Sequence, residues 1–188
     1  MKILTCLSPR ERFSPKMMGA IGLCVYDFTR LSRYKEESII AGTDPQGHLL
    51  DVPYTYVPTP KKWWRHRYQT FIKNGAHLFQ QAHLIEVHNQ PLLALNLASH
   101  HTVTLHLHNT PKTFLNTLYP PHIKKKITQK CAGVLCVSNF IAQQWCKGLP
   151  EHLCAKVHVL YNGLHIPHQK DLLPKEKYIL FVGRILLF

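Results

Sequence analysis

Acidic residues are scarce in this chain, and several common sequence signals are missing. The 188 residues include 10 Asp and Glu against 23 Lys and Arg, which leaves a formal net charge of +13 with His neutral. No apolar run approaches the roughly 18 residues of a membrane-spanning helix, and the amino terminus turns polar too soon for a signal peptide. The six cysteines form no Cys-x-x-Cys pair. This disfavours a zinc ribbon and indicates the reduced thiols of a cytoplasmic protein.

The chain combines a globular composition with a strong positive field. Hydrophobic residues make up 45% and charged residues 18%, which excludes wholesale disorder. A net charge of this size attracts phosphate in nucleic acids, anionic lipids or substrates. A basic phosphate- or nucleic-acid-binding module without catalysis is therefore one hypothesis, although no nucleic-acid-binding fingerprint is present. A hydrolase on a doubly wound sheet is another, but the Gly-x-Ser-x-Gly elbow is absent.

Short apolar runs alternate with segments whose apolar residues lie three and four positions apart. This alternation predicts an α/β fold, namely a single Rossmann-like, doubly wound parallel sheet with helices on both faces. The expected strands cover residues 2–7, 37–41, 52–57, 83–88, 102–108, 133–137 and 156–161, and the expected helices cover residues 20–34, 62–74, 92–98, 121–131 and 139–147.

Polar side chains follow several expected strands, and an open parallel sheet binds its ligands beyond the carboxyl ends of its strands. The relevant pairs are Asn89-Gln90, His108-Asn109, Ser138-Asn139 and Asn162-Gly163. His88 and Asn89 are candidates for contact with acceptor hydroxyls, or else belong to turn chemistry before Pro91. Ser138 is first of all a candidate helix N-cap, whose free amides could also receive a phosphate.

Histidines are concentrated around one expected strand. His106 and His108 lie two apart and so share a face, with His100 and His101 nearby, which makes a metal site conceivable. The alternative is a histidine-rich strand end at which one histidine meets the ligand. We favour the alternative and predict no metal, because no carboxylate or cysteine lies at ligand spacing.

A basic and aromatic segment occupies residues 61–68. Trp63, Trp64, Arg65 and Arg67 have the composition of a helix that lies in an anionic membrane interface. The alternative is a helix that packs its aromatic side on the sheet and exposes its basic side. The three lysines at positions 124–126 are expected to form a solvated helix face.

Seven segments, taken in chain order, resemble the amino-terminal domain of family 4 glycosyltransferases, which are retaining enzymes of the two-Rossmann-domain (GT-B) architecture. They are MKIL, the loop at Met18-Gly19, IEVHNQP (85–91), LHLHNTP (105–111), VLCVSNFI (134–141), VLYNGLHI (159–166) and YILFVGR (178–184). The resemblance implies hexosyl transfer from a nucleotide-diphosphate sugar to an acceptor hydroxyl, without a cofactor or a metal.

The resemblance also implies roles for individual residues. His108 would be catalytic, beside the transferred sugar, whereas Gly19 and Arg184 would bind the donor diphosphate, Arg184 through its planar fork. His88, Asn89, Asn109 and Ser138 are the candidate acceptor-binding residues. The acceptor would be a glycan or lipid-linked, as in cell-envelope polysaccharide synthesis. The protein would be cytoplasmic, with peripheral contact to the inner face of the membrane, and nucleic acid is not an expected partner.

The same resemblance divides the chain. Residues 1–165 would form the acceptor-side domain, residues 166–177 a linker, and residues 178–188 the first strand of a truncated second domain. The apolar ending has no following helix to cover it, which indicates truncation; the alternative is that it pairs with the existing sheet. Because the second domain would hold most of the donor site, we expect the chain alone to transfer sugar poorly.

Overall fold

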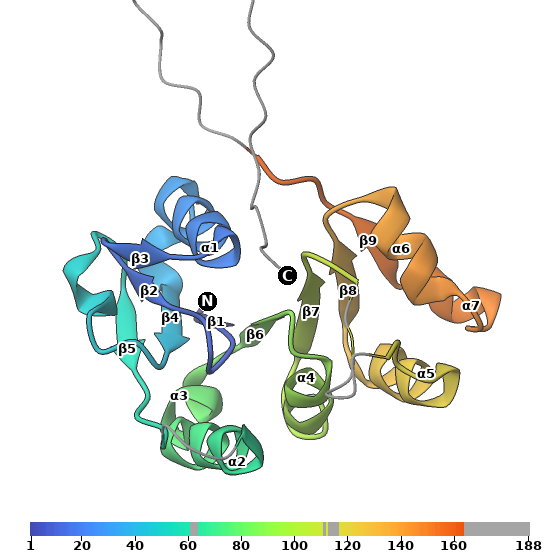
Figure 1. Ribbon diagram of the computed structural model, residues 1–188, viewed down its shortest axis with the longest axis horizontal. Coiled ribbons are helices and arrows are strands. Elements are labelled where there is room, and N and C mark those ends of the chain that lie inside the picture. Colours follow the sequence, from blue (N-terminus) through green and yellow to red (C-terminus); the bar gives the residue numbers. More distant parts are fainter. Residues whose placement is uncertain (61–63, 111, 113–116, 164–188) are drawn as a thin grey trace, which may run out of the picture.

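A sheet of seven parallel strands forms the centre of the structure (Figure 1). The computed structural model describes residues 1–60, 64–110, 112 and 117–163, and only the backbone of residues 64–66. The strand order is β5-β4-β1-β6-β7-β8-β9, and it reverses direction at β1, as in a doubly wound fold. This confirms the predicted fold class. The strands are β1 (Ile3–Cys6), β4 (Ser38–Gly42), β5 (Tyr54–Tyr56), β6 (Leu84–His88), β7 (Val103–Leu107), β8 (Gly133–Cys136) and β9 (Val157–Val159).

Helices connect these strands, and local sequence explains where several of them begin. Proline occupies the first turn of α4 and α5, where its missing N–H costs nothing. Ser138 caps α6, because its side chain accepts a hydrogen bond of 3.3 Å from the amide of Ile141, as predicted. The helices are α1 (Ala20–Leu31), α2 (Trp64–Asn74), α3 (Ala76–Gln81), α4 (Pro91–Leu97), α5 (Pro121–Lys130), α6 (Asn139–Cys146) and α7 (Glu151–Cys154).

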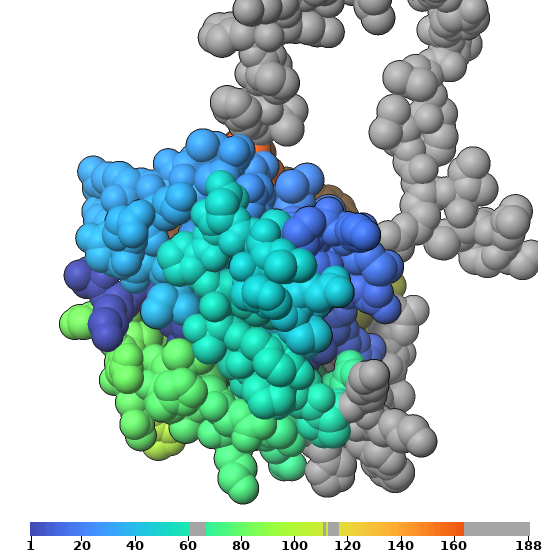
Figure 2. All heavy atoms as spheres, turned by 90° about the vertical axis from the view of Figure 1, so that its left-hand side faces the viewer, coloured from blue at the N-terminus to red at the C-terminus, as the bar shows by residue number. Residues whose placement is uncertain are grey.

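Some short elements were not predicted. A two-stranded ribbon, β2 (Phe13–Ser14) with β3 (Met17–Met18), lies between β1 and α1, and two 3-10 turns, Lys35–Glu37 and Gly47–Leu49, flank β4. Figure 2 views the molecule from the β5 edge and shows the segment from α1 to β5 (blue to teal) above the α2 and α3 pair (green). Elements this short carry too few residues for a periodic sequence signal.

The sheet separates two hydrophobic clusters, because successive strand residues point to opposite faces. On β4, Ile40 packs with Val25 of α1, whereas Ala41 packs on the opposite face with Phe71 of α2. Figure 1 shows α1 on one side of the sheet and α2 to α5 on the other. The hydrophobic cluster on the α2 side is larger than the one on the α1 side.

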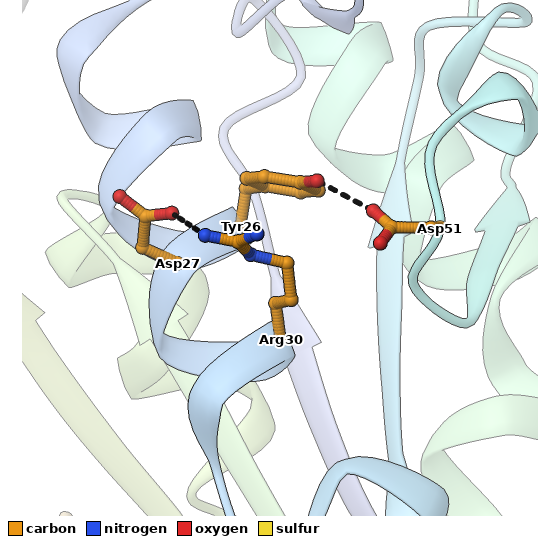
Figure 3. Close-up of polar contacts among 4 residues, drawn as sticks. All are labelled: Tyr26, Asp27, Arg30 and Asp51. Carbon is orange, nitrogen blue, oxygen red and sulfur yellow. Dashed lines mark hydrogen bonds and ion pairs between the residues drawn. The ribbon is translucent and has the colours of Figure 1, made fainter. Parts of the chain in front are cut away.

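Polar contacts tie α1 to the loop that precedes β5 (Figure 3). The hydroxyl of Tyr26 donates a hydrogen bond of 2.5 Å to Asp51, and Arg30 lies 3.5 Å from Asp27. The Arg30 guanidinium also lies 5.4 Å from the centroid of the Tyr26 ring. These contacts hold the outer surface of α1 against its neighbouring loop.

One lysine of α5 corrects the expectation of a solvated basic face. Lys124 is only 7% exposed, and its ammonium donates to the carbonyls of Gln144, Trp145 and Lys147 at 2.5–3.2 Å. These carbonyls end α6, where a helix carries partial negative charge. Lys125 and Lys126 are exposed, as expected. The physical reason is that residue 124 lies on the buried stripe of α5, one turn before Thr128.

Candidate functional site

Three histidines meet at the carboxyl ends of two central strands. In the register of the sheet, His88 of β6 lies beside His106 of β7, and His108 follows His106 by two residues, so all three share one face. That face is the α1 side, because the ring of Phe28 stacks on His106 with centroids 6.1 Å apart. The sequence predicted the shared face of His106 and His108 but not that His88 joins them.

The histidine cluster, defined as His88, His106 and His108, is tightly packed and uncharged at neutral pH. Its ring centroids are 4.5–5.1 Å apart, and Nδ1 of His88 lies 2.8 Å from Nε2 of His108 in a hydrogen bond. Burial lowers the pKa of His106 and of His108 to about 4, and burial together with its two neighbours also holds the pKa of His88 well below its usual value. A charged imidazolium here would lose solvation and repel the others.

Two buried polar atoms of the cluster have no partner among the described residues. The Nε2 atoms of His88 and His106 make no hydrogen bond to any described residue. A buried polar atom of this kind normally has a partner. The cluster therefore has unused hydrogen-bonding capacity at the end of the sheet where ligands of such folds bind.

The same histidines are the described group that could hold a metal ion. Their ligand atoms lie within 4.8 Å of one another, whereas tetrahedral zinc with bonds of about 2.05 Å separates its ligand nitrogens by about 3.3 Å. The 2.8 Å contact between His88 and His108 is that of a hydrogen-bonded pair. To bind zinc, the nitrogens of His88 and His108 would have to move apart, and the most widely separated pair of ligand nitrogens would have to move closer together.

Asn89 connects the ends of β6 and β7. It has a positive φ of 52°, a left-handed conformation that Asn tolerates better than most residues. Its Oδ1 accepts from the amide of His108 at 2.9 Å, and its Nδ2 donates to Oδ1 of Asn109 at 3.1 Å. Its side-chain amide thus fixes the backbone that carries His108, which gives Asn89 a positioning role that turn propensity alone did not predict.

A cavity of about 860 Å³ opens beside this junction, on the α2 and α4 side. It lies between α2, α4, the start of α5 and the loops after β1, β6 and β7. Its described lining is Arg10, Tyr68, Gln69, Ile72, Asn89, Gln90, Leu92, Leu93, Asn96, Lys112, Tyr119, Pro120 and Ile123. Asn89 belongs both to this lining and to the contact with His108, so the cavity and the histidine cluster are adjacent.

A hydrogen-bond network shapes one wall of this cavity. The Tyr68 hydroxyl donates to Gln90 Oε1, and Gln90 Nε2 donates to the Ser8 hydroxyl at 2.9 Å. Ser8 in turn accepts from the amide of Arg10 at 3.3 Å. Gln90 stood in the polar pair after β6, but Arg10 and Tyr68 come from distant parts of the chain, so no local pattern could assign them here.

Gly19 lies at the start of α1, as the resemblance implies, but a carboxylate already reaches that helix end. The Glu11 side chain accepts from the amide of Gly22 at 3.4 Å, and a Cβ at position 19 would collide with it. An anion at a helix N-terminus is favourable. A donor phosphate would therefore have to displace Glu11, and the donor role of Gly19 stays a prediction.

The remaining predicted residues are only partly described. Trp63 and Arg184 lie outside the described residues, as do the linker and the final strand, and the side chains of Trp64 and Arg65 are not described. Arg67 is half-buried, and its Nε donates to the carbonyl of Pro60 at 2.7 Å. Phe71, on the same helix, is fully buried, so part of α2 packs on the sheet. No helix of the described residues is long and apolar enough to cross a membrane.

The strand order and the helices on the two faces of the sheet define a Rossmann-like α/β domain. Among solved structures, the chain is similar to the crystal structure of Anabaena Alr3699/HepE in complex with UDP and glucose, with a TM-score of 0.58 and 16% sequence identity. The match covers 87% of this chain but 45% of that one, so the chain spans less than half of that protein. No protein-family model and no characterised protein sequence matches. The likeness shows the fold.

Proposed function

We propose that this chain is the acceptor-side domain of a retaining glycosyltransferase of family 4, which transfers a hexose from a nucleotide-diphosphate sugar to an acceptor hydroxyl. The observation that carries the proposal is the junction of His88, Asn89 and His108 at the carboxyl ends of β6 and β7, beside a cavity. The fold shared with a protein crystallised with UDP and glucose supports it.

His108 is the residue that we place beside the transferred sugar. In the reaction the bond from the anomeric carbon to the diphosphate breaks, the acceptor oxygen bonds to the same face of that carbon, and the acceptor proton is released. A neutral imidazole can orient the sugar through a hydrogen bond or stabilise charge at the anomeric centre. Burial keeps the pKa of His108 at about 4, so it is neutral at the pH of the reaction.

Transfer by this mechanism needs a second domain for the donor. In the proposal, Arg184 neutralises the leaving diphosphate, and a donor-binding lobe closes over the carboxyl edge. We therefore expect the 188-residue chain alone to bind nucleotide sugars weakly and to transfer no sugar. The acceptor enters on the side of the cavity, which Asn89 lines, and Asn109 is hydrogen-bonded to Asn89.

A binding experiment tests the proposal directly. ¹⁵N-histidine-labelled chain is titrated to millimolar UDP-glucose, UDP-N-acetylglucosamine and GDP-mannose, and ring nitrogens are followed by NMR. We expect one of these donors to shift the ring-nitrogen signals of His108. In the His108→Asn variant, the signals of the other histidine rings should no longer respond to that donor. His77→Asn is the control, since His77 is exposed on α3, the helix that leads into the amino end of β6. No response to any donor would contradict the proposal.

The net charge of +13 favours one other function, a basic module that binds nucleic acid or phosphate without catalysis. Such binding is dominated by phosphate contacts and weakens steeply with salt. Titration with a random-sequence DNA duplex at 50 and 200 mM salt separates the two. We expect weak binding without sequence preference that disappears at the higher salt; tight binding that survives 200 mM salt would favour the module.

A further inference from the structure

We propose that the cavity between α2, α4 and the start of α5 selects acceptors that carry an oxyanion on an otherwise apolar body, with Arg10 and Lys112 as the residues that recognise the charge. This inference rests on the proposed glycosyltransferase function and names the acceptor class of the same site.

The first observation is that both charged residues in the described lining of the cavity are cations. Arg10 and Lys112 both line it, and none of its described lining residues is an Asp or a Glu. Within the described ranges, the ion pair present is Arg30 with Asp27, on α1. Two cations that face one cavity repel each other mildly, so an anion between them would be stabilised by both.

The second observation is that the loop carrying Arg10 is anchored to the site. The Arg10 amide and the Gln90 side chain both donate to the hydroxyl of Ser8, at 3.3 and 2.9 Å. Gln90 also accepts from Tyr68 of α2. The backbone at Arg10 is thereby fixed against two cavity walls, which lowers the entropic cost of holding its side chain near a ligand.

The third observation is the apolar side of the same cavity. Ile72 of α2, Leu92 of α4 and Ile123 of α5 line it and are partly or fully exposed, with Leu92 at 48%. Large apolar side chains left open in a concave site are typical of ligand pockets, and a volume of 860 Å³ lies within the usual range for them. A fully polar sugar would leave this wall unused, whereas an amphiphile would cover it.

The chemistry of the cations favours an oxyanion over other anions. A guanidinium donates two parallel hydrogen bonds to a phosphate or a carboxylate, and an ammonium adds a point charge. Asn96 and Gln69 supply neutral donors and acceptors nearby for hydroxyls. A phosphate ester and a carboxylic acid share this chemistry, so the experiment compares them.

Four probes with the same eight-carbon chain separate these possibilities: octyl phosphate, octanoate, octyl glucoside and octanol, each kept below its micelle concentration. Binding to the ¹⁵N-labelled 188-residue chain is followed through the side-chain amides of Asn89, Gln90 and Asn96. We expect saturable shifts with octyl phosphate, at least fivefold weaker binding of octyl glucoside, and intermediate binding of octanoate.

Two variants and one control locate the charge recognition. Arg10→Gln and Lys112→Gln should each weaken octyl phosphate binding at least fivefold and leave octyl glucoside binding unchanged. Lys126→Gln removes the same charge from an exposed position outside the cavity and should change binding less than twofold. Amide spectra of each variant show whether it is folded.

Octanoate binding more tightly than octyl phosphate would assign a carboxylate acceptor and keep the proposal. Equal binding of the glucoside and the phosphate, or equal losses in all three variants, would overturn it. The donor titration described above is independent: if octyl phosphate binds as expected but no nucleotide sugar reaches His108, the glycosyltransferase function fails while the anion site stands.

Discussion

Acidification from pH 7 to pH 5 should destabilise this domain through its histidine cluster. His106 is 4% exposed, and burial lowers its pKa from 6.5 to about 4. Since the folded-state pKa lies below the unfolded value, the unfolded chain binds more protons in this range. The stabilisation is therefore complete above pH 6.5 and is lost progressively as the pH falls towards 4.

The lowered pKa of His106 sets how much unfolding free energy is lost on acidification. Each unit of pKa difference corresponds to about 1.4 kcal/mol, and integration from pH 7 to pH 5 gives a loss of about 2 kcal/mol for His106 alone. His88 and His108 act in the same direction, because burial lowers their pKa values too. Glu86 acts in the opposite direction, because burial raises the pKa of its carboxyl. A comparison of variants is needed to isolate one histidine.

Urea unfolding at pH 7, 6 and 5, followed by circular dichroism with EDTA present, provides the assay. His106→Leu should reduce the fall in unfolding free energy between pH 7 and pH 5 by about 2 kcal/mol relative to the parent. His77→Gln, at an exposed position on α3, should leave the fall unchanged. An unaltered pH dependence in His106→Leu would refute the argument that this ring is held neutral by burial.

Other substitutions test single contacts, each by urea unfolding unless stated. Lys124→Met should cost about 2–3 kcal/mol, because the carbonyls that end α6 lose a charged donor, whereas Lys125→Met should change stability by less than about 0.5 kcal/mol. Asn89→Ala should cost about 1–3 kcal/mol through its left-handed backbone and lost hydrogen bonds, and Asn89→Gly less. Trp64→Ala should abolish co-sedimentation with anionic liposomes if α2 lies on membranes; binding that is equal to neutral and anionic vesicles would contradict that role.

The sheet was predictable because its signals are local. Most strands lie in short apolar runs, and the clearest helical segment, α1, has apolar residues three and four positions apart. The alternation of such segments predicted the parallel arrangement. The polar edge was predictable for the same reason, since Asn89 and His108 directly follow strands. Ser138 as the cap of α6 needed only one side chain and one nearby amide.

The rest depends on contacts between distant residues. His88 joins His106 because the register of β6 against β7 places them side by side, and a single sequence does not encode that register in any local pattern. Lys124 has the same residue type as Lys125 and Lys126, and only its position on α5 relative to α6 decides that it is buried. The cavity likewise unites Arg10 with Tyr68 across nearly 60 positions of sequence.

The two faces of the sheet differ in charge at the candidate site, with cations on the α2 side and neutral histidines on the α1 side. Asn89 contacts both. On the α1 side the histidine cluster is neutral, and on the α2 side Arg10 and Lys112 line the cavity without a described carboxylate. If a second domain neutralises the donor diphosphate, the cavity cations are free to bind charge on the acceptor itself. Asn89 bonds the amide of His108 and also lines the cavity. An oxyanion that contacts Asn89 would therefore disturb the residue that holds the backbone of His108. Octyl phosphate binding should shift the ring signal of His108 in the parent chain, and this shift should be lost in Asn89→Gly.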